Sequence, residues 1–283
     1  MKRISPTGDL AFKKCLASEE NKDILGGLIN DFFGVVAEDI TIINPYSIDI
    51  CKKFTEGGKD INELRHTLRD VTASFRTADF ITELQIRKTL HFDERSLYYT
   101  FKRFCENYGV AERMTKGSDG KPNLYSSLRP VYTLNILDYI HYDDEDSLRI
   151  FEFCDPVRNK RFGKDLVKMG CFELQKTKIE TVNQQHWQDF FAGNVKPEAP
   201  DYIKKANDVI DFMNLGEEER KVAEALEKAR ATIQDELAYS FYEGKTEGKI
   251  ETAKSMLQDG EKPEKIAKYT GLPLEQIYQL QPA

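Results

Sequence analysis

Three polar residues in two short, strand-like runs carry the most specific chemistry in the chain. Asp70 lies in LRDVTASF, and Glu83 and Gln85 lie one residue apart in ADFITELQIR. Because alternate side chains of a strand share a face, Glu83 and Gln85 are expected to project together, and Asp70 meets them if the two strands pair. Two carboxylates with little else are a typical protein site for Mg²⁺, which takes further oxygens from water and substrate phosphates.

A divalent metal held by Asp70 and Glu83 would suit hydrolysis of a phosphodiester bond. A bound metal lowers the pKa of a water and neutralises charge on the leaving oxygen. The spacing alone is weakly specific, because acidic residues on strands often belong to a solvated face. A transposase that uses a triad of carboxylates is disfavoured, because the order of elements shows no third acid in a suitable context.

The composition fits a soluble globular protein with one sizeable core and a helical tail. Of the 283 residues, 40% are hydrophobic and 31% are charged. No apolar run approaches the roughly 20 residues of a membrane span, and the N-terminus has no apolar signal-peptide region. Five widely spaced cysteines argue against zinc and against a disulfide framework, and they predict a reducing cytoplasm. No motif of nucleotide, dinucleotide or esterase enzymes occurs, so no organic cofactor is expected.

The charge of the chain is unevenly distributed. A net charge of −7 is unusual for a DNA-binding protein, because phosphate contacts need Lys and Arg. Between residues 95 and 129, however, the chain has seven basic residues and only three acidic ones. The seven are Arg95, Lys102, Arg103, Arg113, Lys116, Lys121 and Arg129. This segment offers a local basic face on an acidic body.

Helical and strand-like patterns follow one another along the first 180 residues. Helices are expected over 8–33, ending at Gly34, and over 91–108. Strands are expected over 39–50, interrupted near Pro45, around Asp70, around Glu83, and over 129–140, 148–155 and 172–179. Residues 109–129 carry turn signals typical of a hairpin or loop. Strands flanked by helices in this order predict a mixed sheet in an α/β domain.

The helix expected over 91–108 has two distinct faces. One face is apolar and is expected to pack in the core; it carries Leu97, Phe101, Phe104, Cys105 and Tyr108. The other face carries Arg95, Tyr99, Lys102, Arg103 and Glu106. We expect its first four members to be candidate DNA contacts, since guanidinium and phenol groups bind phosphate backbones. An equally good alternative is that Arg95 holds a carboxylate while Tyr98 and Tyr99 pack on the sheet.

The sequence after residue 180 is predominantly helical. A long helical run from about residue 217 carries apolar residues at spacings of three or four, namely Val222, Leu226, Ala229, Ile233, Leu237 and Phe241. This stripe can pack on the preceding domain or form a homodimer with a second copy. The tail, PEKIAKYTGLPLEQIYQL, has the shape of two short helices with a glycine turn, as in a helix-turn-helix fragment. Its second helix offers Gln276 and Gln279 but no Lys or Arg, which favours a structural or oligomerisation role.

Four segments together resemble a known protein family. They are GDLAFKK at 8–14, LHFDERSLYYTFKRFCENYG at 90–109, YSSLRPVYTLNILDYI at 125–140 and FELQKTK at 172–178. With the Asp70 and Glu83 runs, they resemble the Rpn family of recombination-promoting nucleases and transposases, a branch of the PD-(D/E)XK nuclease superfamily. The resemblance extends to about residue 180, with a further match in the tail. It implies a restriction-endonuclease-like domain over 1–180, followed by a helical region over 181–283.

The resemblance also implies roles for individual residues. Asp70 and Glu83 correspond to the two acidic metal ligands, and Gln85 stands where most of the superfamily has a lysine. Asp9 corresponds to an accessory acidic residue of the first helix, although Asp is also a common helix N-cap. A glutamine cannot supply the positive charge of a lysine, and Arg87 or Lys88 are the expected substitutes.

The implied activity is a DNA endonuclease that depends on Mg²⁺ or Mn²⁺ and is associated with recombination or mobile elements. The alternative is a nuclease fold retained as a DNA-binding or protein-interaction module without turnover. The acidic net charge and the glutamine at the lysine position motivate that alternative.

Overall fold

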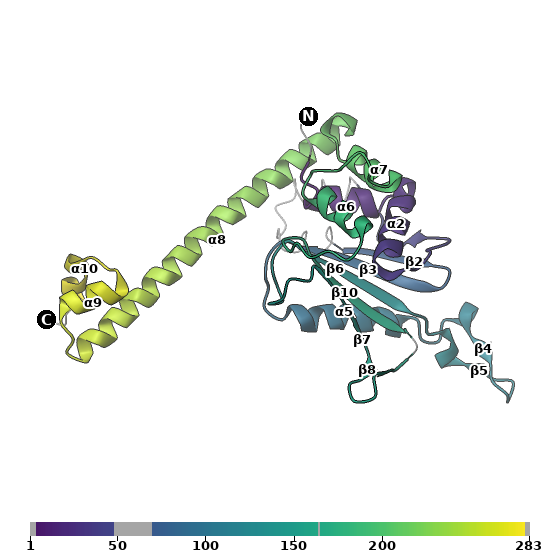
Figure 1. Cartoon of the computed structure of the whole chain (residues 1–283), viewed down its shortest axis with the longest axis horizontal. Helices are drawn as coiled ribbons and strands as arrows, with labels where there is room; N and C mark the ends of the chain where they lie inside the picture. The colour runs from purple at the N-terminus through teal and green to yellow at the C-terminus, as the bar shows by residue number, and fades with distance from the viewer. Residues whose placement is uncertain (1–3, 48–69, 164, 281–283) are drawn as a thin grey trace. The chain divides into compact units, whose positions relative to one another are not determined.

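The fold centres on a six-stranded mixed sheet (Figure 1). The computed structural model describes residues 4–47, 70–163 and 165–280, and its contacts divide the chain into two compact units, 1–224 and 225–283. The sheet lies in the first unit, in the order β1-β2-β3-β6-β10-β7. Its strands are β1 (Thr41–Ile42), β2 (Asp70–Phe75), β3 (Ala78–Gln85), β6 (Val131–Leu137), β10 (Val167–Glu173) and β7 (Leu148–Glu152). The expected α/β class with a mixed sheet is confirmed.

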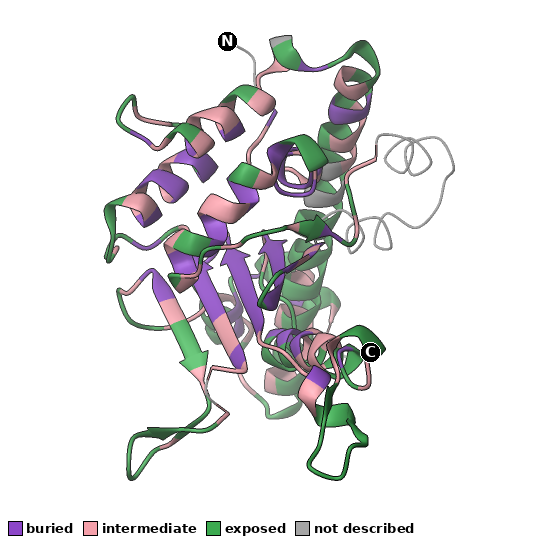
Figure 2. Ribbon diagram, turned by 90° about the vertical axis from the view of Figure 1, so that its right-hand side faces the viewer, coloured by how far each residue is buried: buried purple, intermediate pink, exposed green. Residues whose placement is uncertain are grey.

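The middle strands form the buried part of the sheet. β3 and β6 run parallel and are buried along their whole length, and β10 continues the parallel arrangement beside β6 (Figure 2). β2 folds back on β3 through the two residues between them, giving an antiparallel pair. β7 is antiparallel to β10 at the sheet edge and is partly exposed. The largely apolar run of β6 is typical of a strand covered on both faces, whereas β3 is buried although half of its residues are polar.

Helices cover both faces of this sheet. α1 (Asp9–Leu16), α2 (Lys22–Phe33), α6 (Val182–Phe191) and α7 (Asp201–Val209) gather on one side, and α5 (Phe92–Glu106) lies on the other (Figure 1). Phe32 and Phe33 of α2 meet Phe172 and Phe80 of the sheet, with ring centroids 4.8 and 6.1 Å apart. Even-numbered residues of β3 therefore face α2, and the odd-numbered ones face α5.

The single helix expected over 8–33 is two helices. The side chains of Ser18 and Asn21 both donate to the carbonyl of Lys14, at 2.7 and 3.0 Å, and so end α1. A short 3₁₀ turn, η1 (Glu19–Asn21), then leads into α2. α2 ends where expected, at Gly34, whose φ of 66° suits a residue without a Cβ atom.

The helix expected over 91–108 is confirmed as α5, but the face expected to be buried is wrong. Leu97 is 40% exposed, and Cys105 and Tyr108 are also exposed. The buried residues of α5 are instead Phe92, Ser96 and Thr100. The face of β6 that α5 covers carries polar side chains. The small hydroxyl residues of α5 therefore pack against this face. Thr100 bonds Thr133 at 2.8 Å, and Asn135 donates to Ser96 at 2.9 Å.

Two other strand boundaries differ from the sequence expectation. The strand placed at 172–179 lies at 167–173, because the chain turns after Glu173, where Leu174 N–H donates to the Leu137 carbonyl at the end of β6. The strand placed at 39–50 is only β1, and residues 48–50 lie outside the described part. The expected hairpin within 109–129 is present as β4 (Thr115–Lys116) and β5 (Pro122–Asn123). A second hairpin pairs β8 (Cys154–Asp155) with β9 (Lys160–Arg161).

The C-terminal helices follow the predicted pattern. α8 (Glu217–Gln258) is a single helix, and α9 (Pro263–Thr270) and α10 (Leu274–Gln279) meet at Gly271, which has a φ of 68°. A small core holds the end of α8 against these two helices and contains Ala253, Ile266, Leu272 and Ile277. α6 and α7 belong by contact to the first unit, so the division at residue 180 stays a proposal. None of the helices among the described residues combines the length and apolar character that crossing a membrane requires.

Candidate active site

Asp70 and Glu83 occupy directly opposite positions of the antiparallel β2–β3 pair. Opposite residues of such a pair share a face of the sheet, with Cβ atoms about 4.5–5.5 Å apart. The side chain of Asp70 lies outside the described part of the structure, so this placement follows from the backbone register. The strand pairing on which the sequence argument depended is present.

The Glu83 carboxylate is buried and held by two neighbours. Gln85 Nε2 donates to Glu83 Oε1 at 2.6 Å, and Arg95 Nη2 donates to the same oxygen at 3.0 Å. Gln85 is itself buried, only 4% exposed. The part of the alternative in which Arg95 holds a carboxylate is confirmed, but Tyr98, which it placed on the sheet, is 61% exposed. Gln85 orients the carboxylate through an uncharged donor, while Arg95 balances its charge.

A polar cleft of about 210 Å³ opens between the sheet and α5. Glu83 lies on its wall, together with Ile81 of β3 and Thr72 of β2. The residues that α5 contributes are Ser96, Tyr99, Lys102, Arg103 and Glu106. The cleft thus joins the candidate metal ligand to the α5 face on which DNA contacts were expected.

Several lining residues were missed by the sequence argument. They are Ile43, Asn44, Thr72, Ile81, Thr133 and Asn135, together with Ser96 and Glu106 of α5. Thr133 and Asn135 lie opposite Ile81 and Glu83 in the parallel β3–β6 register. The sequence signal that could have placed Thr133 and Asn135 in the site is that both are polar and occupy alternate positions of an otherwise apolar strand. Asn44 Oδ1 accepts the Thr72 backbone N–H at 2.8 Å, which ties the segment after β1 to β2.

The four candidate DNA contacts have different surroundings. Tyr99, Lys102 and Arg103 line the cleft, whereas Arg95 binds Glu83. Arg103 forms ion pairs with Asp79 and Glu106, at 2.7 and 3.1 Å. Lys102 is exposed, and its amino group forms no ion pair or hydrogen bond with any residue that the structure describes. Lys102 is thus the lining cation left to act on a ligand.

Arg87 and Lys88 were the residues expected to replace the motif lysine. β3 ends at Gln85, so alternation along the strand no longer sets the direction of Arg87. Neither residue lines the cleft. Strand alternation therefore does not place Arg87 beside Glu83 and Gln85, and its role as a substitute for the lysine stays a prediction.

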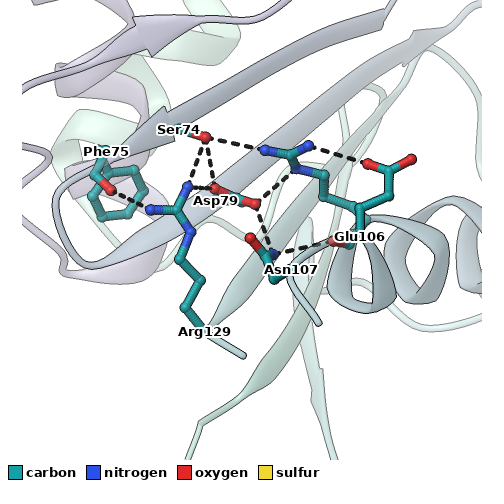
Figure 3. Close-up of polar contacts among 7 residues, drawn as sticks. Ser74, Phe75, Asp79, Glu106, Asn107 and Arg129 are labelled. Carbon is teal, nitrogen blue, oxygen red and sulfur yellow. Dashed lines mark hydrogen bonds and ion pairs between the residues drawn. The ribbon is translucent and has the colours of Figure 1, made fainter. Parts of the chain in front are cut away.

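A second buried carboxylate, Asp79 of β3, binds residues at the end of α5 and just before β6 (Figure 3). Its Oδ2 forms an ion pair with Arg103 Nε at 2.7 Å and accepts a hydrogen bond from Asn107 Nδ2 at 2.9 Å. Its Oδ1 receives Ser74 Oγ at 2.8 Å and also binds Arg129 Nη2. Burial lowers the pKa of Arg129, because desolvation disfavours the charged guanidinium. Asp79 was also missed, although it lies on the same face of β3 as Glu83.

Asp9 is the first residue of α1 and follows Gly8, the N-cap. It is therefore not the cap, although a carboxylate in the first turn still complements the helix dipole. α1 packs beside β2, the strand that begins at Asp70. Among the described side chains, which exclude that of Asp70, no three His, Cys, Asp or Glu residues converge as metal ligands. A metal role for Asp9 stays a prediction.

Residues 6–240 match the profile of the PD-(D/E)XK nuclease family transposases. The chain belongs to that family. The match spans the paired strands, the cleft and most of α8, and it gives the Rpn branch no separate support. No curated protein and no solved structure matches the chain significantly. At the family level, the function is that of a nuclease or transposase, DNA is the implied partner, and a divalent metal is the usual cofactor.

The residues of the cleft suit a hard divalent cation. Asp70 and Glu83 share a face beside a polar cleft, and carboxylate oxygens are the ligands that Mg²⁺ and Mn²⁺ prefer. The Arg95 guanidinium on Glu83 works in the opposite direction, because its positive charge repels a cation bound there. The site therefore fits a metal that competes with Arg95 for the Glu83 carboxylate.

Proposed function

We propose that the protein is a metal-dependent endonuclease that hydrolyses phosphodiester bonds in DNA. The observation that carries the proposal is the register of Asp70 opposite Glu83, beside a cleft lined by Lys102, which pairs with none of the residues that the structure describes. Asp70 and Glu83 would hold Mg²⁺ or Mn²⁺, with Asp9 as an accessory acidic residue. The metal would supply a Lewis acid that neutralises phosphate charge and lowers the pKa of a nearby water.

The other residues of the cleft have separate roles in this proposal. Gln85 fixes the direction of the Glu83 carboxylate through its 2.6 Å hydrogen bond. Lys102 supplies the positive charge that Gln85 lacks and binds the scissile phosphate. Arg103, held by Asp79, adds a second cation to the same wall, and Tyr99 offers a phenol to the DNA backbone. The carboxylates on the sheet side of the cleft would bind the metal, and Lys102 on the α5 side would bind the phosphate.

The proposal extends to the biological setting and the assembly. We also propose an association with recombination or mobile elements, which the family supports, and a cytoplasmic location, which the cysteine usage supports. A homodimer through α8 is supported by the exposure of its apolar stripe. Val222 is buried, whereas Leu237 and Phe241 of the same stripe are 48% and 74% exposed. Packing on a second copy would cover them.

A non-catalytic DNA-binding module is the second candidate. The observation in its favour is the pairing of Glu83 with both Arg95 and Gln85, which satisfies the carboxylate without a metal. This module would keep the cleft and its cations and lack turnover.

Plasmid nicking separates the two candidates. Wild type, Asp70→Ala and Glu83→Ala are incubated with supercoiled DNA in Mg²⁺, in Mn²⁺ and in EDTA. The endonuclease proposal predicts nicking by wild type that needs metal and disappears in both variants. DNA binding with no nicking by any of the three proteins would favour the module.

A further inference from the structure

The basic residues between 95 and 129 fall into two groups. The first group forms ion pairs with buried carboxylates: Arg95 pairs with Glu83, and both Arg103 and Arg129 pair with Asp79. The side chains of the other four form no ion pair or hydrogen bond with the described residues. These four are Lys102, Arg113, Lys116 and Lys121. The first lies in the cleft, and the other three lie in the segment between α5 and β6.

That segment forms an arm, defined here as residues 107–129, which carries the β4–β5 hairpin away from the sheet (Figure 1). Both ends of the arm are held by one carboxylate, since Asn107 and Arg129 bind Asp79 (Figure 3). Ser127 Oγ closes the base by donating to the Asn107 carbonyl at 2.7 Å. Asp79 lies four residues before Glu83 on β3, so the arm is fixed relative to the strand that carries the candidate metal ligand.

The arm also exposes aromatic rings. Tyr108 and Tyr125 are 46% and 70% exposed, and their ring centroids lie 5.1 Å apart in an edge-on contact. The arm has two acids, Glu112 and Asp119, and the latter already accepts the Lys121 backbone N–H at 3.0 Å. Free cations beside exposed rings are the combination with which proteins hold single-stranded nucleic acid, by phosphate contacts and base stacking.

We propose that the arm binds an unpaired stretch of the DNA strand that leaves the cleft. Arg113, Lys116 and Lys121 contact its phosphates, and Tyr125 stacks on one of its bases. The inference rests on the proposed function, because it takes DNA as the occupant of the cleft. The inference is based on the attraction between DNA phosphates and the positive charges of the protein. These charges begin with Lys102 on the wall of the cleft and continue in the arm, which follows α5 in the chain. Stacking on Tyr125 requires an exposed base face, which a fully paired duplex does not offer.

Fluorescence anisotropy in EDTA, without turnover, tests the proposal on a labelled single strand and on its duplex. The Arg113→Ala/Lys116→Ala/Lys121→Ala variant is compared with Arg158→Ala/Lys160→Ala/Arg161→Ala, which removes the same charge from the exposed β8–β9 hairpin. We expect the arm variant to lose about ten-fold or more in single-strand affinity. Its salt slope should fall by about two, because each phosphate contact contributes roughly 0.7 for single strands. The control should stay within about two-fold of wild type.

Tyr125→Ala tests the stacking independently of charge. We expect a loss of about five-fold or more on the single strand, in line with the usual contribution of base–aromatic stacking, and little change on the duplex. Tyr125→Phe keeps the ring and should bind as wild type does. Thermal unfolding of each variant checks that the fold is retained.

The outcomes separate the inference from the proposed function. Equal losses in the arm and control variants, equal effects of Tyr125→Ala on both DNAs, or no DNA binding by wild type would each overturn the role of the arm. If arm variants bind as wild type does while wild type nicks plasmid, only the inference fails. If the arm binds DNA as described and wild type never nicks, only the proposed endonuclease fails.

Discussion

Gln85 donates a 2.6 Å hydrogen bond to Glu83, two residues earlier on the same strand. Gln85, which the resemblance places at the position of the superfamily lysine, is therefore bound to the candidate metal ligand. The positive charge expected at this site has to come from another element, and Lys102 of α5 is the lining cation available for it.

Replacement of Gln85 tests whether it orients Glu83. Gln85→Ala removes the donor and should slow plasmid nicking by about 10- to 100-fold, the usual cost of losing a residue that orients a metal ligand. Gln85→Lys keeps a donor in reach of Glu83 and should nick within about ten-fold of wild type. Nicking by Gln85→Ala at the wild-type rate would show that the hydrogen bond is dispensable.

Arg95 should weaken metal binding by its charge. Arg95→Gln removes a positive charge that lies 3.0 Å from the Glu83 carboxylate. We expect calorimetry to show Mn²⁺ binding about ten-fold tighter than in wild type, an effect of about 1.4 kcal/mol, because cation repulsion is removed. Lys88→Gln, an exposed lysine outside the cleft, is the matched control and should leave the affinity unchanged. Weaker metal binding by Arg95→Gln would mean that Arg95 mainly positions Glu83.

Asp79 should be essential for stability. Asp79→Asn leaves Arg103 and Arg129 without their buried counter-charge and should lower the free energy of unfolding by about 3–5 kcal/mol. Asp119→Asn, at an exposed carboxylate of the arm, should change it by less than about 0.5 kcal/mol. Urea denaturation measures both values. Equal stability of the two variants would contradict the role given to Asp79.

Glu219 should hold the start of α8 against α1 in a pH-dependent way. Burial raises the pKa of its carboxyl, but hydrogen bonds from Lys14 at 2.7 Å, Gly216 at 3.0 Å and Tyr46 at 2.9 Å outweigh burial and leave the pKa below its usual value. A lowered folded-state pKa stabilises the protein above the unfolded value of about 4.3, and this stabilisation is lost as the pH falls through the folded pKa.

The corresponding measurement is denaturation as a function of pH. Glu219→Gln should lower the free energy of unfolding by about 1–3 kcal/mol at pH near 7, and the difference from wild type should shrink in acid. Glu217→Gln makes the same change at an exposed residue of α8 that pairs with Lys221, and it should have little effect. A difference that persists unchanged in acid would contradict the assignment to the carboxylate.

The sequence was sufficient for the general architecture. β-branched and apolar residues mark β6 as a buried strand, and Gly34 marks the end of α2. The pairing of Asp70 with Glu83 was conditional on strand pairing, and a two-residue connection leaves the chain little choice but an antiparallel pair. Local patterns of this kind are determined by nearby residues.

The buried face of α5 could not be predicted from local sequence patterns of this kind. Its apolar stripe predicts a buried face only if the surface below is apolar, and that surface carries Thr133 and Asn135. The packing of Ser96 and Thr100 there depends on which strands become neighbours. Asp79 and Glu83 lie on the same face of one strand, so the sequence could not say that Asp79 binds Arg103 and Arg129 whereas Glu83 lines the cleft.

Metal binding measured beside cleavage tests the central claim most directly. Mn²⁺ is titrated into wild type, Asp70→Asn, Glu83→Gln and Lys102→Ala without DNA, and the same preparations are assayed on plasmid. We predict that the two carboxylate variants lose both metal binding and nicking, while Lys102→Ala binds metal normally and nicks about 100-fold more slowly. Unchanged metal affinity in Glu83→Gln, or full nicking by Asp70→Asn, would contradict a metal site formed across β2 and β3.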